Sequence, residues 1–355
     1  EINFPAVATT LPRQADSVSS SGGALPAFFA GLLPEGHRLT VLRAAVKTSL
    51  NDELTLLLAV GGDAPGDVQV VPGGTVPSDP NPVARFTDSG GLDFTKLADA
   101  LDLHALPGMH NKVSASMLSA PLAMSDGRYI LKLDSSEYPY LVRNEALHLV
   151  AARALKIPVA DARIITDLFG RQALLVTRFD RQRQPSGSWL RLPLEDATQV
   201  LNLPPSAKYQ VSTEAAISAL ANLCAAKPVA IRNLYLQFVY SWLTGNGDLH
   251  AKNISVLAGP ASPWKISPVY DVPCTLLYGD DSLALTVAGK TKNLKARHWA
   301  ELANGIGLPP KAAEAANARA LRAAEAVDLT TLGLTGSPLN RAVRELTFRR
   351  HELAG

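Results

Sequence analysis

The sequence predicts an α+β protein with a small mixed part ahead of a mainly helical one, and two patterns carry this prediction. Apolar, β-rich runs at 129–133 and 173–177 flank a helical stretch at 143–155, an order typical of a small mixed sheet with one helix. Asn144 is the expected N-cap of that helix. After Pro193 helical periodicity dominates, and helices are expected over 213–226, 229–244, 296–305, 309–327 and 338–352.

The N-terminal part is expected to be helical and to end in a linker. Apolar residues recur at three- and four-residue spacing in three predicted helices, over 25–33, 39–47 and 52–60. A dense run of Pro and Gly between Val71 and Pro82 can continue neither a helix nor a strand, so it predicts a boundary near 81–91. The chain has 355 residues, and we divide it into three parts, at 1–90, 91–181 and 182–355.

Composition limits the partners that the chain is expected to have. Hydrophobic residues make up 47% of the chain, charged residues 19%, and the net charge is +2. Nucleic acid as the main partner would require a strong basic excess, which this near-neutral balance lacks. The basic residues near the C-terminus are better explained as a solvated helix face; they are Arg341, Arg344, Arg349 and Arg350.

Cysteine usage and hydropathy favour a cytoplasmic protein without a membrane partner. The two cysteines, Cys224 and Cys274, are expected to be free buried thiols, as in a reducing compartment. No apolar run is long enough to span a bilayer, and no signal-peptide pattern opens the chain. The chain begins with Glu1 rather than Met, so its natural start is expected to lie upstream.

The segment 243–256 carries the sharpest chemical signal. It joins an apolar helix to an apolar strand through a loop that presents Asp248, His250, Lys252 and Asn253. Phosphoryl transfer needs such a set, because a carboxylate must accept the proton of the attacking hydroxyl and a cation must offset phosphoryl charge. An Asn amide oxygen completes the Mg²⁺ shell. Asp248 and Asn253 stand five apart, as in the kinase loop H-R-D-x-x-x-x-N.

Two further residues fit the same chemistry. Asp271 follows a short apolar run, where a second Mg²⁺-binding carboxylate is expected, although alone it also suits a turn before Pro273. Lys132 lies inside a strand and needs a partner if it is buried, either an ATP phosphate or a carboxylate such as Glu145. The alternative is an edge-strand lysine with its ammonium group in water.

A weaker signal precedes the first strand. The loop 106–116 is rich in small and polar residues, and its backbone N–H groups and Lys112 could surround phosphates. It contains a single glycine, Gly108. Other sites are excluded, since His104 and His110 give no zinc spacing with either cysteine and neither a nucleophile elbow nor a dinucleotide fingerprint occurs.

Segments spread over nearly the whole chain resemble the HipA family, the serine/threonine kinase toxins of bacterial toxin–antitoxin modules. In chain order they are 28–36 (FFAGLLPEG), 106–112 (LPGMHNK), 129–132 (YILK), 144–145 (NE), 157–159 (IPV), 175–181 (LVTRFDR), 190–199 (LRLPLEDATQ), 208–209 (KY), 248–253 (DLHAKN) and 270–271 (YD). So many ordered motifs make the resemblance specific. It implies a two-lobed kinase-like fold, with an N-terminal subdomain (1–90), a small mixed N-lobe (91–181) and a mainly helical C-lobe (182–355).

The resemblance also implies roles for individual residues. Asp248 would be the catalytic base, with His250 and Lys252 supporting its loop. Asn253 and Asp271 would be the Mg²⁺ ligands. The nucleotide contacts would come from Lys132 on the ATP phosphates, from the backbone of Thr177 to Phe179 at the adenine, and from the loop that contains Gly108 and Lys112.

As a whole, the resemblance implies an ATP- and Mg²⁺-dependent serine/threonine kinase that phosphorylates a bacterial protein and arrests growth. The family-type target is an aminoacyl-tRNA synthetase. The family partner is a HipB-like helix-turn-helix antitoxin, through which the kinase meets DNA only indirectly. The chain departs from the family in two places. Ala105 stands where the family usually has a regulatory serine, and the family's opening strands are expected to be shortened or absent.

Two alternatives stay open on the sequence alone. The order of residues in the Asp248 loop also resembles that of phosphoinositide kinases, so the acceptor could be a lipid or a small molecule; the lack of a basic membrane-facing cluster argues against this. The second alternative is an inactive kinase-fold protein that serves as a binding partner or corepressor. Its usual mark is the loss of Lys132, Asp248 or Asp271, and all three are present.

Overall fold

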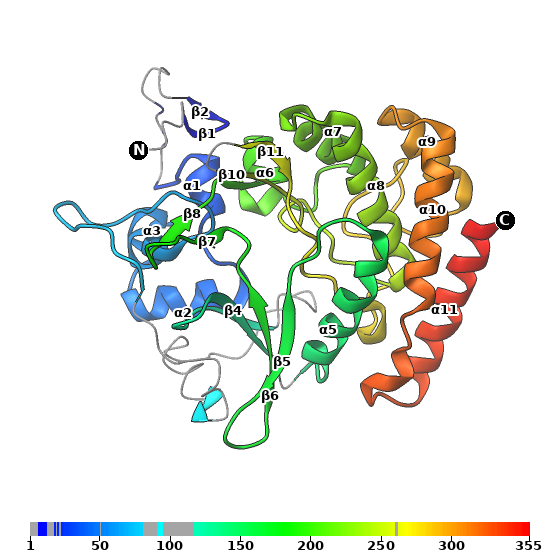
Figure 1. Ribbon diagram of the computed structural model, residues 1–355, viewed down its shortest axis with the longest axis horizontal. Helices are drawn as coiled ribbons and strands as arrows, with labels where there is room; N and C mark the ends of the chain where they lie inside the picture. Colours follow the sequence, from blue (N-terminus) through cyan, green and yellow to red (C-terminus); the bar gives the residue numbers. More distant parts are fainter. Residues whose placement is uncertain are drawn as a thin grey trace.

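The computed structural model describes residues 6–12, 18, 20, 23–49, 51–80, 91–94, 117–135, 137–259 and 262–355. Helices and strands are segregated along the chain, as the α+β prediction requires. Figure 1 shows the N-terminal helices and the larger sheet on one side and a layer of long helices on the other. No helix among these residues is both long enough and apolar enough to cross a membrane.

The N-terminal part is a small helical unit with its own core. Its elements are β1 (Ala6–Ala8), β2 (Leu11–Pro12), α1 (Ala27–Gly31), α2 (Gly36–Val46), α3 (Glu53–Val60) and the 3-10 turn η1 (Gly61–Asp63). The three predicted helices are present, although α1 is shorter than expected. Phe28, Leu32 and Leu57 bury their side chains against one another. Asp52 caps α3 by accepting a hydrogen bond from the Thr55 amide at 3.2 Å.

A four-stranded antiparallel sheet follows, in the order β3-β4-β6-β5. Its strands are β3 (Leu118–Ala123), β4 (Arg128–Leu133), β5 (Ala162–Thr166) and β6 (Gln172–Thr177). Leu131 and Leu175 bury one face together with Phe94. Lys132 lies on β4, between β3 and β6, with its side chain only 12% exposed. The alternative of an edge-strand lysine in water is therefore wrong.

The helix after β4 begins earlier than predicted. This helix, α5 (Leu141–Ala152), starts where the Asp134 carboxylate accepts hydrogen bonds from the amides of Tyr140 at 3.1 Å and Val142 at 2.7 Å. Asn144 is not its N-cap. The Asn144 side chain is buried and instead bonds both backbone groups of Cys274, donating to the carbonyl at 3.0 Å and accepting from the amide at 2.8 Å. This pairing ties α5 to the C-lobe.

The C-lobe contains all five predicted helices. They are α7 (Thr213–Leu223), α8 (Lys227–Thr244), α9 (Ala296–Gly305), α10 (Pro310–Glu325) and α11 (Ser337–Ala354). The apolar strand expected after the Asp248 loop is present as β10 (Ser255–Gly259), which forms a small sheet with β9 (Leu194–Asp196) and β11 (Ser262–Ile266). The other short elements were not predicted; besides β9 and β11 they include β7 (Arg181–Arg183), β8 (Trp189–Arg191) and α6 (Ala197–Val200). Both cysteines are free and buried, as expected.

The central helix α8 is buried along its second half and ends abruptly. Ala316, Ala320 and Ala323 of α10 are buried against it, since small side chains allow the two helices to approach closely. Gly245 ends α8 with φ +76°, and a Cβ there would lie 2.9 Å from Cys274 Sγ. Only glycine fits at this position, so the chain turns sharply into the loop that follows.

A buried ionic cluster joins the N-terminal part to the segment after β6. Asp63 accepts from Arg178 at 2.9 Å and from Arg181 at 3.1 Å, while Asp180 accepts from the same arginines at 2.9 and 2.8 Å. The amide of Gly66 donates to Asp180 at 2.9 Å. Burial alone would raise the pKa of Asp180, but the two arginines outweigh burial and lower this pKa below its usual value.

Removing one member of this cluster should destabilise the protein strongly. Asp180→Ala leaves the two buried arginines, Arg178 and Arg181, to share the single carboxylate of Asp63, so we expect the free energy of unfolding in urea to fall by about 3–5 kcal/mol. The matched control is Asp79→Ala, since Asp79 is 37% exposed and pairs with Arg191; it should lose about 0–1 kcal/mol. Equal losses in the two variants would contradict a structural role for the buried cluster.

Candidate active site

The loop after α8 is fixed in place by its own polar groups. The Asp248 amide donates to Asn246 Oδ1 at 2.8 Å. The Asp248 carbonyl accepts from the amide of His250 at 2.8 Å and from Asn253 Nδ2 at 3.0 Å. Asp248, His250 and Asn253 are all buried. The loop therefore presents its carboxylate on a rigid turn between a buried helix and β10.

Asp271 reaches this loop from the segment that follows β11. Its backbone has φ +55°, an uncommon conformation for a residue other than glycine, which neighbouring contacts must hold. Asn253 Nδ2 donates to Asp271 Oδ2 at 2.9 Å, and Asn246 Nδ2 donates to the Asp271 carbonyl at 3.4 Å. The two predicted metal ligands thus lie in direct contact.

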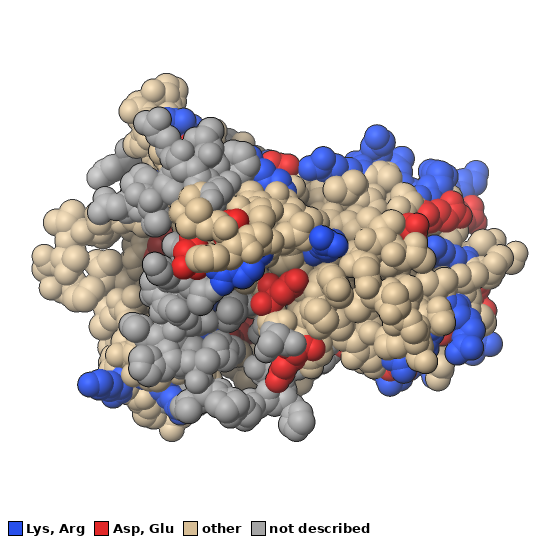
Figure 2. Space-filling model, turned by 90° about the horizontal axis from the view of Figure 1, so that it is seen from below, with Lys and Arg blue, Asp and Glu red and all other residues tan. Residues whose placement is uncertain are grey.

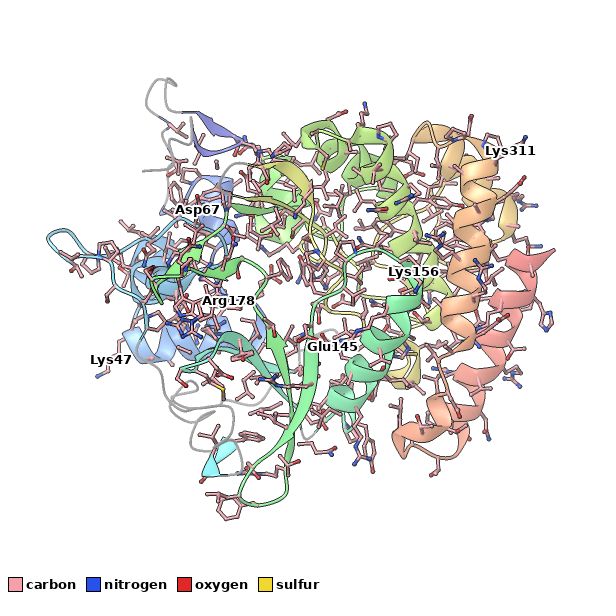
Figure 3. The ribbon with its side chains drawn as sticks, viewed as in Figure 1. Lys47, Asp67, Glu145, Lys156, Arg178 and Lys311 are labelled. Carbon is pink, nitrogen blue, oxygen red and sulfur yellow. The ribbon has the colours of Figure 1, made fainter. Side chains whose placement is uncertain are left out.

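Lys132 connects the sheet to both α5 and the C-lobe. Its ammonium group donates to the two Glu145 carboxylate oxygens at 2.8 and 2.7 Å and to Asp271 Oδ1 at 2.7 Å. Figure 3 shows Glu145 on α5, on the side of that helix nearest the sheet. The carboxylate partner proposed for Lys132 is therefore present, and Asp271 is a second one.

The charges in this group shift one another. Burial alone would lower the pKa of Lys132, but the carboxylates of Asp271 and Glu145 raise it above its usual value, so the lysine stays charged. Burial raises the pKa of Glu145 to about 7; Lys132 opposes this shift and the nearby Asp271 charge adds to it. A cation or a phosphate bound beside these side chains would directly change the balance of charge among Lys132, Glu145 and Asp271.

The contacts of His250 and Lys252 hold the Asp248 loop in place. Lys252 Nζ donates to Asp196 Oδ2 and to the carbonyl oxygen of Gly31, both at 2.8 Å. The Lys252 amide donates to His250 Nδ1 at 3.2 Å. Lys252 thus ties the loop to the N-cap of α6 and to the end of α1. Asp196 was missed as a contributor because no spacing rule links it to a residue so far along the chain.

Tyr209 is another residue that sequence spacing did not single out. Its hydroxyl donates to Asp248 Oδ1 at 2.9 Å, and its ring meets His250 edge-on at 5.1 Å between centroids. The sequence offered only the Lys208–Tyr209 pair as one of the segments that resemble the family. No local pattern could place it beside a loop some forty residues later.

Backbone hydrogen bonds limit which groups of the segment 177–179 could contact an adenine. The Thr177 amide donates to the Asp161 carbonyl at 2.8 Å, and the Arg178 amide donates to the Arg128 carbonyl at 2.9 Å. These two amides are engaged within the sheet, so a base would have to use their carbonyls or the backbone of Phe179. The ring of Phe179 packs near that of Tyr270, at 5.6 Å between centroids.

The donor set suits Mg²⁺ better than a metal that needs many protein ligands. Across the described ranges there is no group of three or more His, Cys, Asp and Glu arranged to hold an ion. Asp271 and Asn253 offer oxygen atoms, and Mg²⁺ is usually held by one or two protein ligands with water and phosphate completing its shell. Gly108 and Lys112, predicted to cover the nucleotide, lie outside the described residues.

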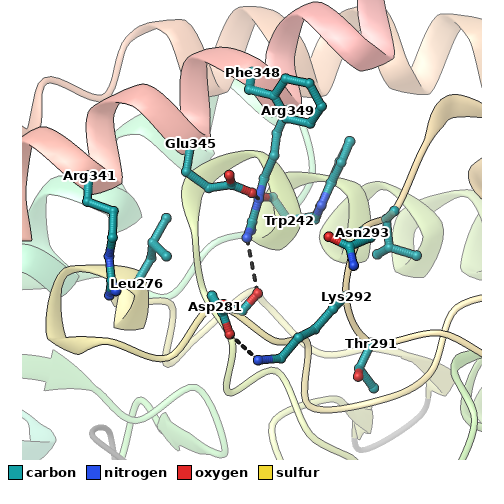
Figure 4. Close-up of a pocket in the computed structure, with 11 residues that line it drawn as sticks. Trp242, Leu276, Asp281, Thr291, Lys292, Asn293, Arg341, Glu345, Phe348 and Arg349 are labelled. Carbon is teal, nitrogen blue, oxygen red and sulfur yellow. Dashed lines mark hydrogen bonds and ion pairs between the residues drawn. The ribbon is translucent and has the colours of Figure 1, made fainter.

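A separate pocket in the C-lobe does not share residues with this site. Figure 4 shows it between α11 and the segment 291–294, with Trp242 and Phe348 in its lining. Four of its charged groups form two ion pairs, Lys292 with Asp281 at 2.5 Å and Arg349 with Glu345 at 2.8 Å, and Arg341 is a further cation in the lining. Arg349 also donates to the Asp281 carbonyl at 3.2 Å, and this hydrogen bond links α11 to the loop.

Surface charge agrees with the near-neutral composition. On the face shown in Figure 2, the Lys and Arg side chains of the C-lobe lie scattered among uncharged and acidic ones. Among the residues that the structure describes on that face, the basic side chains form no continuous surface of the size that direct nucleic-acid binding would need.

Comparison with known proteins agrees with this geometry. Residues 104–327 match the profile of the HipA-like C-terminal domain, and residues 3–71 match that of the HipA N-terminal domain. A candidate kinase of Sinorhizobium fredii, Y4mE, is 28% identical over 85% of this chain and 78% of its own length. The serine/threonine-protein kinase toxin HipA of Shewanella oneidensis is 27% identical over 86% of this chain and 76% of its own.

A solved structure supports the fold. HipA of Shewanella oneidensis, in complex with HipB and its operator DNA, superposes with a TM-score of 0.75, at 22% identity over 93% of this chain and 85% of that chain. The two-lobed fold that the resemblance implied is thereby confirmed. Because the C-terminal profile alone spans more than half of its residues, the chain belongs to the HipA family.

Proposed function

We propose that the chain is an ATP- and Mg²⁺-dependent serine/threonine protein kinase of the HipA toxin type. The main support is the contact of Lys132 with both Glu145 and Asp271, at 2.7 to 2.8 Å. In protein kinases a strand lysine paired with a helix glutamate, beside a metal-binding Asp, is the arrangement that must be in place for phosphoryl transfer. The same elements meet in this chain.

In this proposal each residue has one task. The Asp248 carboxylate accepts the proton of a serine or threonine hydroxyl while that oxygen forms a bond to the γ-phosphorus of ATP. The bond from the γ-phosphorus to its bridging oxygen breaks, and ADP leaves. Lys132 holds the phosphates, and the segment 177–179 meets the adenine. Mg²⁺, held by Asp271 and Asn253, would supply charge neutralisation to the phosphates.

The biological partners are proposed by analogy with the family. The Shewanella relative was solved with HipB and operator DNA, and we propose a HipB-like helix-turn-helix antitoxin for this chain. DNA would then be met through the antitoxin, which the net charge of +2 permits. The proposed substrate is a bacterial protein, of which the family-type example is an aminoacyl-tRNA synthetase. Its phosphorylation would take place in the cytoplasm and would arrest growth.

Loss of the proposed base should abolish transfer. Incubation with γ-labelled ATP, Mg²⁺ and a bacterial lysate should give a labelled protein band, which mass spectrometry can then identify. Asp248→Asn keeps the size of the side chain and removes its basicity, so we expect transfer to fall by about 10²–10⁴-fold. Label in lipid rather than protein would favour the lipid alternative, and no label despite nucleotide binding would favour the inactive binding partner.

Removal of the buried ammonium group should weaken nucleotide binding. We expect Lys132→Met to raise the Kd for Mg-ATP by roughly 10- to 100-fold, since hydrogen bonds to charged groups contribute about 1.5–3 kcal/mol. Lys311→Met is the control, because Lys311 lies exposed on α10, as Figure 3 shows, and its loss should leave the Kd unchanged. An unchanged Kd in Lys132→Met would remove Lys132 from the nucleotide site.

Loss of the Asp271 carboxylate should raise the Mg²⁺ requirement. Asp271→Asn retains the shape of the side chain and removes one negative charge from the proposed metal site. We expect the Mg²⁺ concentration for half-maximal transfer to rise by about ten-fold or more, because Mg²⁺ prefers charged oxygen ligands. A wild-type Mg²⁺ titration curve in this variant would exclude Asp271 as a ligand.

A further inference from the structure

The loop that carries Asp248 is contacted by a tyrosine from outside the loop. We propose that Tyr209 is a positioning residue for Asp248, and that Glu35 of the N-terminal part holds it in place through Lys208. This inference rests on the assignment of Asp248 as the base in the proposed function. Sequence motifs alone gave Tyr209 no role.

Tyr209 is fastened to the loop at three points. Its hydroxyl donates to Asp248 Oδ1 at 2.9 Å. Its ring lies edge-on against the ring of His250, at 5.1 Å and 82°. The amide of Ala251 donates to the carbonyl of Lys208, the preceding residue, at 3.1 Å. The backbone and side chain of the 208–209 segment therefore move with the loop.

The hydrogen bond sets the orientation of the base. A carboxylate on a single-bonded side chain can rotate, and each orientation presents its oxygens differently to an incoming hydroxyl. A donor fixed on Oδ1 of Asp248 restricts that rotation before the substrate binds, which lowers the entropic part of the barrier. Burial and the Asp248 charge raise the pKa of Tyr209 above its usual value, so the phenol keeps its proton and remains a donor.

The N-terminal part holds this tyrosine indirectly. The Lys208 ammonium forms an ion pair with Glu35, and it also lies 5.0 Å from the centre of the Tyr209 ring. Glu35 is the N-cap residue of α2, directly before its first residue. Four residues earlier, the carbonyl of Gly31 accepts from Lys252 at 2.8 Å.

The turn 31–35 therefore contacts the catalytic loop from two directions, through Lys208–Tyr209 and through Lys252. Figure 1 shows α1 beside α6, at the point where the N-terminal unit meets the C-lobe. The orientation of Asp248 thus depends on residues more than two hundred positions earlier in the chain. Without Glu35, the Lys208 ammonium would lose its ion-pair partner, and the Tyr209 ring would lose the cation that this pair holds beside it.

The first test removes a single hydroxyl. Tyr209→Phe keeps the ring, its contact with His250 and its contact with Lys208. We expect kcat for phosphoryl transfer to fall about ten-fold while the KM for ATP stays within about two-fold, because the nucleotide contacts are untouched. The control is Tyr240→Phe, which removes another buried hydroxyl, one that donates to the His148 carbonyl at 2.7 Å. It should lower the melting temperature without changing kcat.

The second test examines the link to the N-terminal part. Glu35→Gln should lower kcat several-fold with little change in KM, and the Tyr209→Phe and Glu35→Gln pair should lose no more activity than Tyr209→Phe alone. Such non-additivity is expected when two residues act in series on one carboxylate. If the two losses multiply, the link through Lys208 is wrong.

The outcomes separate this inference from the proposed function. A wild-type kcat in Tyr209→Phe, alongside an inactive Asp248→Asn, would overturn the positioning role and leave the kinase assignment standing. A wild-type chain that transfers no phosphate at all would instead overturn the proposed function itself. A fall in kcat that is matched by Tyr240→Phe would show a general effect of stability, which also overturns the inference.

Discussion

The structure depends on one buried cation shared by two carboxylates. Lys132 comes from the sheet, Glu145 from α5 and Asp271 from the C-lobe, so a single ammonium group joins three segments that the chain visits far apart. An unpaired ammonium at this depth would be very costly, and the two carboxylates, side by side without it, would repel each other. Each group is tolerable only when the others are present. The same three side chains therefore fix the relative placement of the sheet, α5 and the C-lobe and also form part of the candidate active site.

Around the Lys132 ammonium group, polar side chains mostly form hydrogen bonds with backbone groups. Asn144 satisfies both backbone groups of Cys274, and Asn246 accepts from the amide of Asp248. Amides buried beside a tight turn need partners of this kind, because the turn cannot supply regular ladder hydrogen bonds. Asn246 also donates to the carbonyl of Asp271 at 3.4 Å, which supports the positive-φ conformation of that residue. Hydrogen bonds within the protein therefore fix the Asp248 loop and Asp271 in place without a ligand.

Much of the fold could be predicted from the sequence, because long periodic segments carry strong signals. The helices of the C-lobe and the strand around Lys132 appeared where periodicity and β-propensity indicated. The start of α5 was missed, since Asn144 looked like a cap but was needed by Cys274, a partner 130 residues away. Tyr209 and Asp196 were missed for the same reason. Their roles arise from tertiary contacts that no local pattern records, and the domain boundaries at 90 and 181 remain predictions.

The ionic cluster at Asp63 has a mechanical consequence. Arg178 anchors the N-terminal unit to the segment after β6, and Gly31 anchors it to the loop of Asp248. The unit is therefore attached to both lobes. A unit attached to both lobes acts as a brace. A movement of one lobe against the other would have to break either the Asp63 cluster or the hydrogen bond between Lys252 and Gly31.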